Sequence, residues 1–280
     1  MIVTINGFVI NDSTNANSVY LDEPLSGLSM PPIRTSQGTY SGRDGGYVGS
    51  QFYAMRLITM TGFIFSANVA AVETARRAFE AAVSSGGPFP VNITTNAGNQ
   101  YVVLCYLDGL DIPIQRAPNR APFILTLIAT DPTIFDNSAG GIQTATIAPA
   151  VGGGVAMPFI WTPLIWTPGA SPTTVTNPGN VLAFPTITLN NAMTNPTILN
   201  VTTGQFITFN GLTTSAGDQL VIDMKNRTVL LNGGSILTYV STTSSWWGLV
   251  VGANSIKLTT TNGADTVTGT FTWRTGYRGI

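Results

Sequence analysis

Histidine is absent from this chain of 280 residues, and cysteine occurs only once, as Cys105. Without histidine the chain has no Ser-His-Asp or Cys-His pair, no histidine-ligated zinc and no imidazole proton shuttle. A single cysteine can neither close an internal disulfide nor build a four-thiolate metal site. The sequence therefore predicts no enzyme of these classes and no metal or other cofactor.

Charged side chains are also scarce. They make up 9% of the residues, whereas soluble domains average roughly 25%. The 12 basic and 13 acidic residues give a net charge of -1, and the 81 residues between Asp136 and Asp218 carry no formal charge. Surface charge normally keeps a freely diffusing monomer in solution, so this stretch favours a surface that neighbouring molecules cover.

Long hydrophobic runs are missing as well. The longest nearly apolar run, residues 121–129, is far shorter than the ~20 residues that span a bilayer. The N-terminal segment shows no basic and apolar regions of signal-peptide length. We expect no membrane insertion, and we expect the chain to be synthesised in a reducing cytoplasm. The few Lys and Arg residues argue against phosphate-driven nucleic-acid binding.

Hydrophobic spacing predicts one helix in a chain that is otherwise rich in strands. The helix is expected over residues 68–83, with Asn68 as its N-cap and Gly86-Gly87-Pro88 ending it. In the first half, apolar stretches rich in β-branched residues predict strands over residues 55–65, 91–95, 101–107 and 123–130.

The second half predicts an all-β domain. Thr, Val and Ile recur in short runs separated by Asn-Gly and Gly-Asp turns, which is typical of an antiparallel β-sandwich. The nine expected strands are residues 183–189, 197–202, 205–210, 219–224, 227–231, 235–240, 247–251, 255–260 and 268–273. The chain thus divides into a domain over residues 1–136, a Gly/Pro-rich linker or arm over residues 137–174 and a domain over residues 175–280.

Tryptophan is confined to the second half and suggests two alternatives. Trp161 and Trp166 lie in a short Ile-Trp-Thr-Pro repeat, and Trp246 and Trp247 are adjacent. Side chains of adjacent residues in a strand point to opposite faces, so we expect one of the last two to fill the core and the other to be exposed or in an interface. Alternatively, these four residues contact a glycan or a protein partner.

Carboxylate pairs are the remaining candidates for catalysis. Glycosidases use two carboxyl groups roughly 5 to 9.5 Å apart across a cleft. The candidates are Asp22/Glu23, Asp108/Asp111 and Asp218/Asp223. Asp22 and Glu23 are adjacent in sequence and point in opposite directions if the chain is extended. Asp108, Asp111 and Asp218 stand at turn positions, where Asp caps its own backbone. We expect structural roles and no enzymatic activity, with a cell-wall hydrolase as the alternative that requires two of them to converge.

Several short motifs occur in an order that resembles siphophage distal tail proteins. In the first half these are Arg56-Leu-Ile-Thr-Met-Thr-Gly62, the helix after it and Ala129-Thr-Asp-Pro132. The second half carries Asn177-Pro-Gly-Asn180, Gly217-Asp-Gln-Leu-Val-Ile-Asp223, Arg227-Thr-Val-Leu-Leu-Asn-Gly233 and Ser245-Trp-Trp-Gly-Leu249. The resemblance covers nearly the whole chain, although the Trp-Thr-Pro repeat has no place in the family pattern.

The resemblance implies a mainly β fold, with an N-terminal split β-barrel plus one helix and a C-terminal galectin-like β-sandwich. It implies a structural protein of the virion, assembled in the host cytoplasm as a homo-hexameric ring. The ring would join the tail-tube protein to tip or receptor-binding proteins and leave an axial channel for DNA.

Arg43, Asp44 and Tyr47, in a glycine-rich segment, and Arg56 are the candidate subunit contacts. A plain solvent loop is the alternative for the glycine-rich segment. For the whole chain, the alternative function is a glycan-binding sandwich that recognises host surface carbohydrate.

Overall fold

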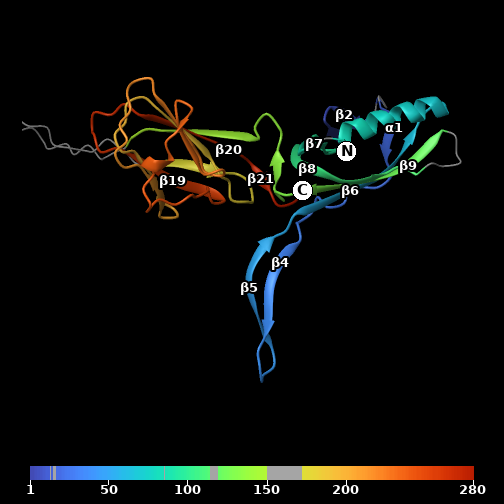
Figure 1. Ribbon diagram of the computed structural model, residues 1–280, viewed down its shortest axis with the longest axis horizontal. Helices are drawn as coiled ribbons and strands as arrows, with labels where there is room; N and C mark the ends of the chain where they lie inside the picture. The colour runs from blue at the N-terminus through green and yellow to red at the C-terminus, as the bar shows by residue number, and fades with distance from the viewer. Residues whose placement is uncertain (13, 15–16, 85, 114–118, 150–171) are drawn as a thin grey trace, which may run out of the picture. The chain divides into compact units, whose positions relative to one another are not determined.

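The computed structural model describes residues 1–12, 14, 17–84, 86–113, 119–149 and 172–280. They form two compact units, one of residues 1–141 and 277–280 and the other of residues 142–276 (Figure 1). In the described part of the chain, α1 is the only α-helix and the remaining regular structure is almost all strand. The predicted class, mainly β with one helix, is confirmed.

The first unit is a nearly closed, barrel-like sheet. Its strands run in the order β2-β1-β7-β8-β9-β6-β3, and the Asn11 backbone N–H donates to Val19 O at 2.9 Å where the first and last strands approach. The elements are β1 (Ile2–Ile5), β2 (Phe8–Ile10), β3 (Val19–Leu21), β6 (Arg56–Phe65), α1 (Val69–Val83), β7 (Phe89–Thr94), β8 (Gln100–Asp111), β9 (Arg120–Ala129) and β10 (Ile134–Asp136). A separate hairpin consists of β4 (Ile33–Thr39) and β5 (Gly46–Tyr53).

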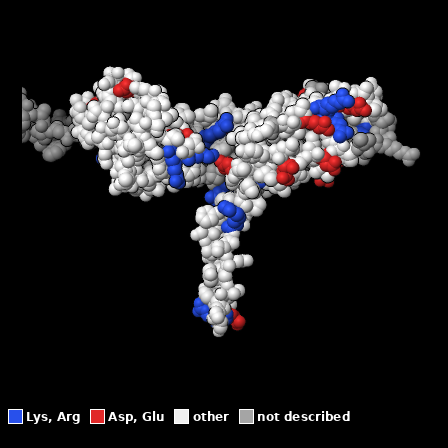
Figure 2. All heavy atoms as spheres, viewed as in Figure 1, with Lys and Arg blue, Asp and Glu red and all other residues white. Residues whose placement is uncertain are grey.

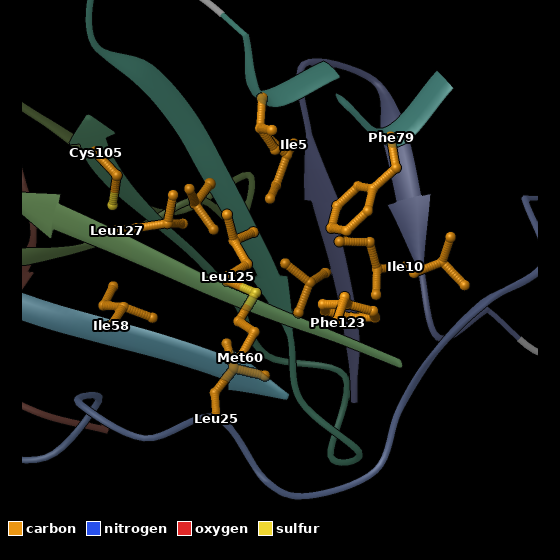
Figure 3. Close-up of a cluster of buried hydrophobic side chains, with 14 of the residues drawn as sticks. Ile5, Ile10, Leu25, Ile58, Met60, Phe79, Cys105, Phe123, Leu125 and Leu127 are labelled. Carbon is orange, nitrogen blue, oxygen red and sulfur yellow. The ribbon is translucent and has the colours of Figure 1, made fainter. Parts of the chain in front are cut away.

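Helix α1 seals the core of this unit. Asn68 is its N-cap, as predicted, because the Asn68 side chain accepts a hydrogen bond from Ala71 N at 2.9 Å. Phe79 stacks on Phe8, with ring centroids 5.5 Å apart, and meets the Phe123 ring edge-on at 5.0 Å. Figure 3 shows Phe79 with buried side chains of the surrounding strands. The packed aromatic cluster holds the helix against the sheet.

The second unit is an antiparallel β-sandwich. One sheet has the order β11-β20-β13-β16-β17-β18 and the other β12-β19-β14-β15, with a single hydrophobic core between them. The elements are β11 (Ile142–Ile147), β12 (Thr173–Asn177), β13 (Thr186–Asn190), β14 (Thr197–Asn200), β15 (Gln205–Thr208), β16 (Gln219–Asp223), β17 (Thr228–Leu231), β18 (Gly234–Ser235), the 3-10 helix η1 (Leu237–Tyr239), β19 (Gly252–Thr259) and β20 (Thr268–Arg274), with β21 (Gly276–Tyr277) at the boundary between units.

Three details differ from the sequence-based expectation. The predicted linker, residues 137–174, includes β11, which pairs along β20 and belongs to the sandwich. The strand expected over residues 235–240 is mostly the 3-10 turn η1. The one expected over residues 247–251 forms only an isolated bridge, between Ala183 and Leu249. In the first stretch Ile236 and Val240 pack against the core, and in the second Trp247 and Leu249 are buried in it, in both cases without a regular ladder.

Three buried asparagines hold the loops at one end of the sandwich. Asn177 donates to the carbonyls of Val181 and Leu249, at 2.8 and 3.0 Å. Asn254 is fully buried; its amide donates to Val250 O and Gly252 O, and its Oδ1 accepts from Val250 N and from Asn200. Because these side chains satisfy buried backbone groups, the loops keep their shape where the strand ladders end.

We predict that Asn254→Ala destabilises the second unit by about 2–4 kcal/mol, since it leaves buried groups of Val250 and Gly252 unpaired. Denaturant unfolding followed by tryptophan fluorescence measures the change, because all five Trp residues lie between residues 161 and 273. The matched control is Asn190→Ala, which removes one 3.2 Å contact with Gln219. Equal midpoints for the two variants would contradict the prediction.

Asp218 gives the second unit a defined acid response. Its carboxylate accepts from Ser215 N and from the Asn232 amide, both at 2.8 Å, and these bonds lower the pKa of Asp218. In the unfolded chain the pKa of an Asp side chain is about 3.9. Because the pKa of Asp218 is lower in the folded state, its ionised form stabilises the fold at pH values above about 3.9. This stabilisation is lost as the pH falls through the folded-state pKa.

We therefore predict that Asp218→Asn lowers the melting temperature at pH 7 and that the difference from the wild type shrinks between pH 5 and about pH 3. Fluorescence-detected melts across this range measure it. A difference that stays constant down to pH 3 would show that the ionised form of Asp218 contributes nothing.

Candidate functional site: an exposed hairpin with a clamped base

The β4–β5 hairpin is a two-stranded ribbon that lies outside the barrel. Every strand residue except Gly38 and Tyr53 is exposed, so neither face of the ribbon is covered (Figure 1). Val48 is 63% exposed and Phe52 is 62% exposed, and Ile33 and Tyr47 are also exposed. A lone hairpin is at best marginally stable in water, so this ribbon has the character of a surface that a partner covers.

Aromatic contacts order the tip of the hairpin. The Arg43 guanidinium carbon lies 3.8 Å from the centre of the Tyr40 ring, and the Tyr40 and Tyr47 rings are 6.0 Å apart. Gly38 allows this packing, since a Cβ there would meet the Tyr47 ring at 2.6 Å. The structure thus brings Arg43 and Tyr47 together at the exposed tip, with Asp44 in the same turn.

Charges on the ribbon are few. Figure 2 shows the hairpin white between its base and its tip, where Arg and Asp side chains appear. Apart from Arg34 near the base, the strands β4 and β5 carry no charged residue. The middle of the hairpin therefore presents apolar and neutral polar side chains, which suit burial against another protein better than long exposure.

Arg56 was predicted as a subunit contact, and the structure corrects this. Its side chain is 1% exposed. The guanidinium donates from Nε and Nη2 to Pro132 O, from Nη1 to Gly27 O and Ser29 O, and from Nη2 to Arg278 O. Burial lowers the pKa of Arg56, but a guanidinium stays charged in proteins. Arg56 is an internal cation surrounded by backbone carbonyls and offers no surface to a neighbour.

Sequence reasoning missed the base of the hairpin. Ala54 N donates to Pro32 O at 2.7 Å and closes the ribbon. Arg278 donates to the Tyr53 hydroxyl and lies 4.7 Å from the centre of its ring. The hairpin itself could have been found, because Arg43-Asp-Gly-Gly46 separates two strand-like runs. No local pattern signals the contact between Tyr53 and Arg278, which are far apart in sequence.

The candidate catalytic carboxylates of the second unit cap turns. Asp218 binds Ser215 N and Asn232, and Asp223 accepts from the backbone N–H groups of Lys225 and Asn226 at 2.9 and 2.8 Å. In the first unit, Asp22 lies 3.9 Å from Arg120. Among the residues that the structure describes, no group of three or more Cys, Asp or Glu is placed to hold a metal ion.

Cys105 and the three tryptophans that the structure describes are largely internal. Burial raises the pKa of the Cys105 thiol to about 12, against a smaller opposing effect of Arg56, so it is not a reactive nucleophile. Trp247 is 1% exposed in the sandwich core, which corrects its candidacy as a glycan contact, and Trp246 is half-buried against the same core. Trp161 and Trp166 lie outside the described residues. No helix of the described chain is long and apolar enough to cross a membrane.

Comparison with known proteins gives one family match and several similar folds. Residues 178–277 match the family model for the C-terminal domain of the siphovirus-type tail component. The crystal structure of SPP1 Dit (gp 19.1), described as a paradigm of hub adsorption apparatus in Gram-positive infecting phages, is similar at TM-score 0.72. Its identity is 14%, over 97% of this chain and 97% of that chain.

A chain of the phage P2 baseplate in its activated conformation with Ca is similar at TM-score 0.49 and 11% identity, over 95% of this chain and 93% of that one. No curated protein sequence matches the chain.

These matches cover both units. The residues that the family model matches lie in the sandwich, except Tyr277. The SPP1 Dit structure shares the fold of the chain almost from end to end. Residues 178–277 therefore resemble the C-terminal domain of the siphovirus-type tail component, the chain shares the fold of SPP1 Dit, and its resemblance to siphophage distal tail proteins is confirmed.

Proposed function

We propose that this chain is a non-enzymatic structural protein of a siphophage tail tip, which assembles as a homo-hexameric ring. The ring joins the tail-tube protein to tip or receptor-binding proteins and leaves an axial channel through which DNA passes without sequence-specific binding. The protein is assembled in the host cytoplasm and stays in the virion. The family match of the sandwich and the Dit fold support this assignment.

The exposed hairpin is the observation that carries the assembly proposal. Its side chains Ile33, Val48 and Phe52 are exposed, and its tip is ordered by its own Tyr and Arg contacts. We infer that the hairpin packs on a neighbouring copy, with Arg43, Asp44 and Tyr47 at the contact. A projecting element that binds a different surface of the next copy makes a heterologous interface, which closes into a ring when the rotation allows it.

The scarcity of charge supports the same proposal. Only three acidic and five basic residues follow Asn137, and Figure 2 shows a mostly uncharged surface over the described sandwich. Such a surface is poorly suited to a free monomer and well suited to contacts with neighbouring proteins. We assign the sandwich to contacts with tip or receptor-binding proteins, and the first unit to the ring.

Native mass spectrometry of the purified chain tests the proposed stoichiometry. We expect a species of six chains of 29.5 kDa each, with smaller species at low concentration. Because oligomer stability depends on protomer concentration, a chain that stays monomeric even at high concentration would contradict the proposal. A different closed stoichiometry would keep the ring and overturn only the number of copies.

We predict that Val48→Asp abolishes assembly or raises the half-assembly concentration at least about tenfold, because an unpaired carboxylate buried in the contact costs more than about 1.4 kcal/mol. Val48 is exposed in the free chain, so the melting temperature of the monomer should hardly change. Light scattering after size exclusion measures the assembly. Val201→Asp, at an exposed site of the sandwich, is the matched control. If Val48→Asp assembled as well as the wild type, the middle of the hairpin would not be part of the interface.

A further inference from the structure

Among the described residues, the β4–β5 hairpin is attached to the first unit at its base, so the base decides the direction in which the hairpin leaves. Nearly all strand residues are exposed, and two contacts fix the ribbon at its base, between Pro32 and Ala54 and between Tyr53 and Arg278. The two strands of the ribbon have seven and eight residues and rise about 3.3 Å per residue. A small rotation at the base therefore displaces the tip by several ångströms.

One side chain connects the segments that enter and leave the hairpin. Arg56 directly follows the hairpin, and its Nη1 donates to the carbonyls of Gly27 and Ser29, which precede it. Gly27 fits this close approach because its φ is +87° and a Cβ there would lie 1.9 Å from Leu57 O. The chain before the hairpin is thereby held directly against the first residues of β6.

The same guanidinium also binds two further segments. Nε and Nη2 donate to Pro132 O at 3.0 and 2.9 Å, and Nη2 donates to Arg278 O. Arg278 in turn binds Tyr53 in the last position of β5, and Ile280 N donates to Leu28 O. A closed set of contacts therefore runs from Arg56 through Arg278 to Tyr53 and back along the chain to Arg56.

We call the carbonyl groups of Gly27, Ser29, Pro132 and Arg278 around the guanidinium the Arg56 cage. The chemistry of this cage requires arginine. A guanidinium has five N–H donors in one plane, and all five are used here on four carbonyl oxygens. A lysine ammonium has three donors at a single point and cannot reach acceptors along different edges of a guanidinium. Arg56→Lys keeps the charge and most of the volume but gives up part of the cage.

We propose that Arg56 is the positioning residue that fixes the base of the β4–β5 hairpin and thereby sets the geometry of the contact between copies. This inference rests on the proposed function, since it assumes that the hairpin contacts a second copy. It assigns to Arg56 an indirect role in assembly, exerted from the interior and through four backbone carbonyls.

Hydrogen-exchange mass spectrometry and light scattering on the full-length Arg56→Lys variant test the proposal together. We expect about tenfold faster exchange, as loss of a buried hydrogen bond implies, in peptides that cover residues 27–34, 53–55 and 277–280. Exchange in β7, on the other side of the sheet order, should stay unchanged. The half-assembly concentration should rise while the secondary structure is retained.

Ile93→Ala is the matched control for a general loss of stability. Ile93 is fully buried in β7, where it stands opposite Val3 and Tyr101. Each variant is measured at a temperature that lies the same number of degrees below its own melting temperature. Assembly that fails in Arg56→Lys and persists in Ile93→Ala supports positioning. Equal losses of assembly would reduce Arg56 to a stability residue and overturn the proposal, as would unchanged exchange at residues 27–34 and 277–280.

Two further outcomes are informative. If Arg56→Lys does not fold, Tyr53→Phe tests the same closed set more gently, because it removes only the hydroxyl that accepts from Arg278. Faster exchange at residues 53–55 and 277–280 then supports the cage, and unchanged exchange overturns it. If the wild type does not assemble, the ring proposal fails and the assembly role of Arg56 fails with it, while the exchange measurement still decides whether Arg56 fixes the hairpin base.

Discussion

The buried guanidinium of Arg56 is the constraint around which the first unit is arranged. A charge removed from water is costly unless hydrogen bonds replace its hydration, and here backbone carbonyls from three separate segments supply them. Those segments must meet in every folded molecule. The start of β6, the approach to the hairpin, the turn after β9 and the last residues of the chain therefore form one rigid corner, from which the β4–β5 hairpin leaves the barrel.

The two units use different means to reach a fixed shape. In the first unit, aromatic packing holds α1 against the sheet and the Arg56 cage joins separate segments of the chain. The hairpin is its large uncovered element. In the second, buried Asn177, Asn200 and Asn254 hold the loops at one end of the sandwich. Each unit has its own core, which suits a tail component that uses one unit for the proposed ring and the other for further partners.

Features with a local cause were predictable from the sequence. Asn68 caps α1 because its side chain binds a backbone N–H three residues on, and the alternation of β6 places Ile58 and Met60 in the core. The role of Arg56 was not predictable, because its acceptors are main-chain atoms up to 222 positions away and any residue type supplies a carbonyl. The dense Gly and Pro punctuation likewise hid β11, whose strand is defined by its pairing with β20.

Negative-stain electron microscopy of the purified full chain tests the central claim most directly, namely that the first unit builds a ring through its hairpin. We predict closed rings with a central hole for the wild type and only small separate particles for a variant whose hairpin surface carries a charge in place of Val48. Rings formed equally by both proteins would show that the hairpin does not hold the copies together. Wild-type fields containing only particles of single-chain size would contradict the assembly itself.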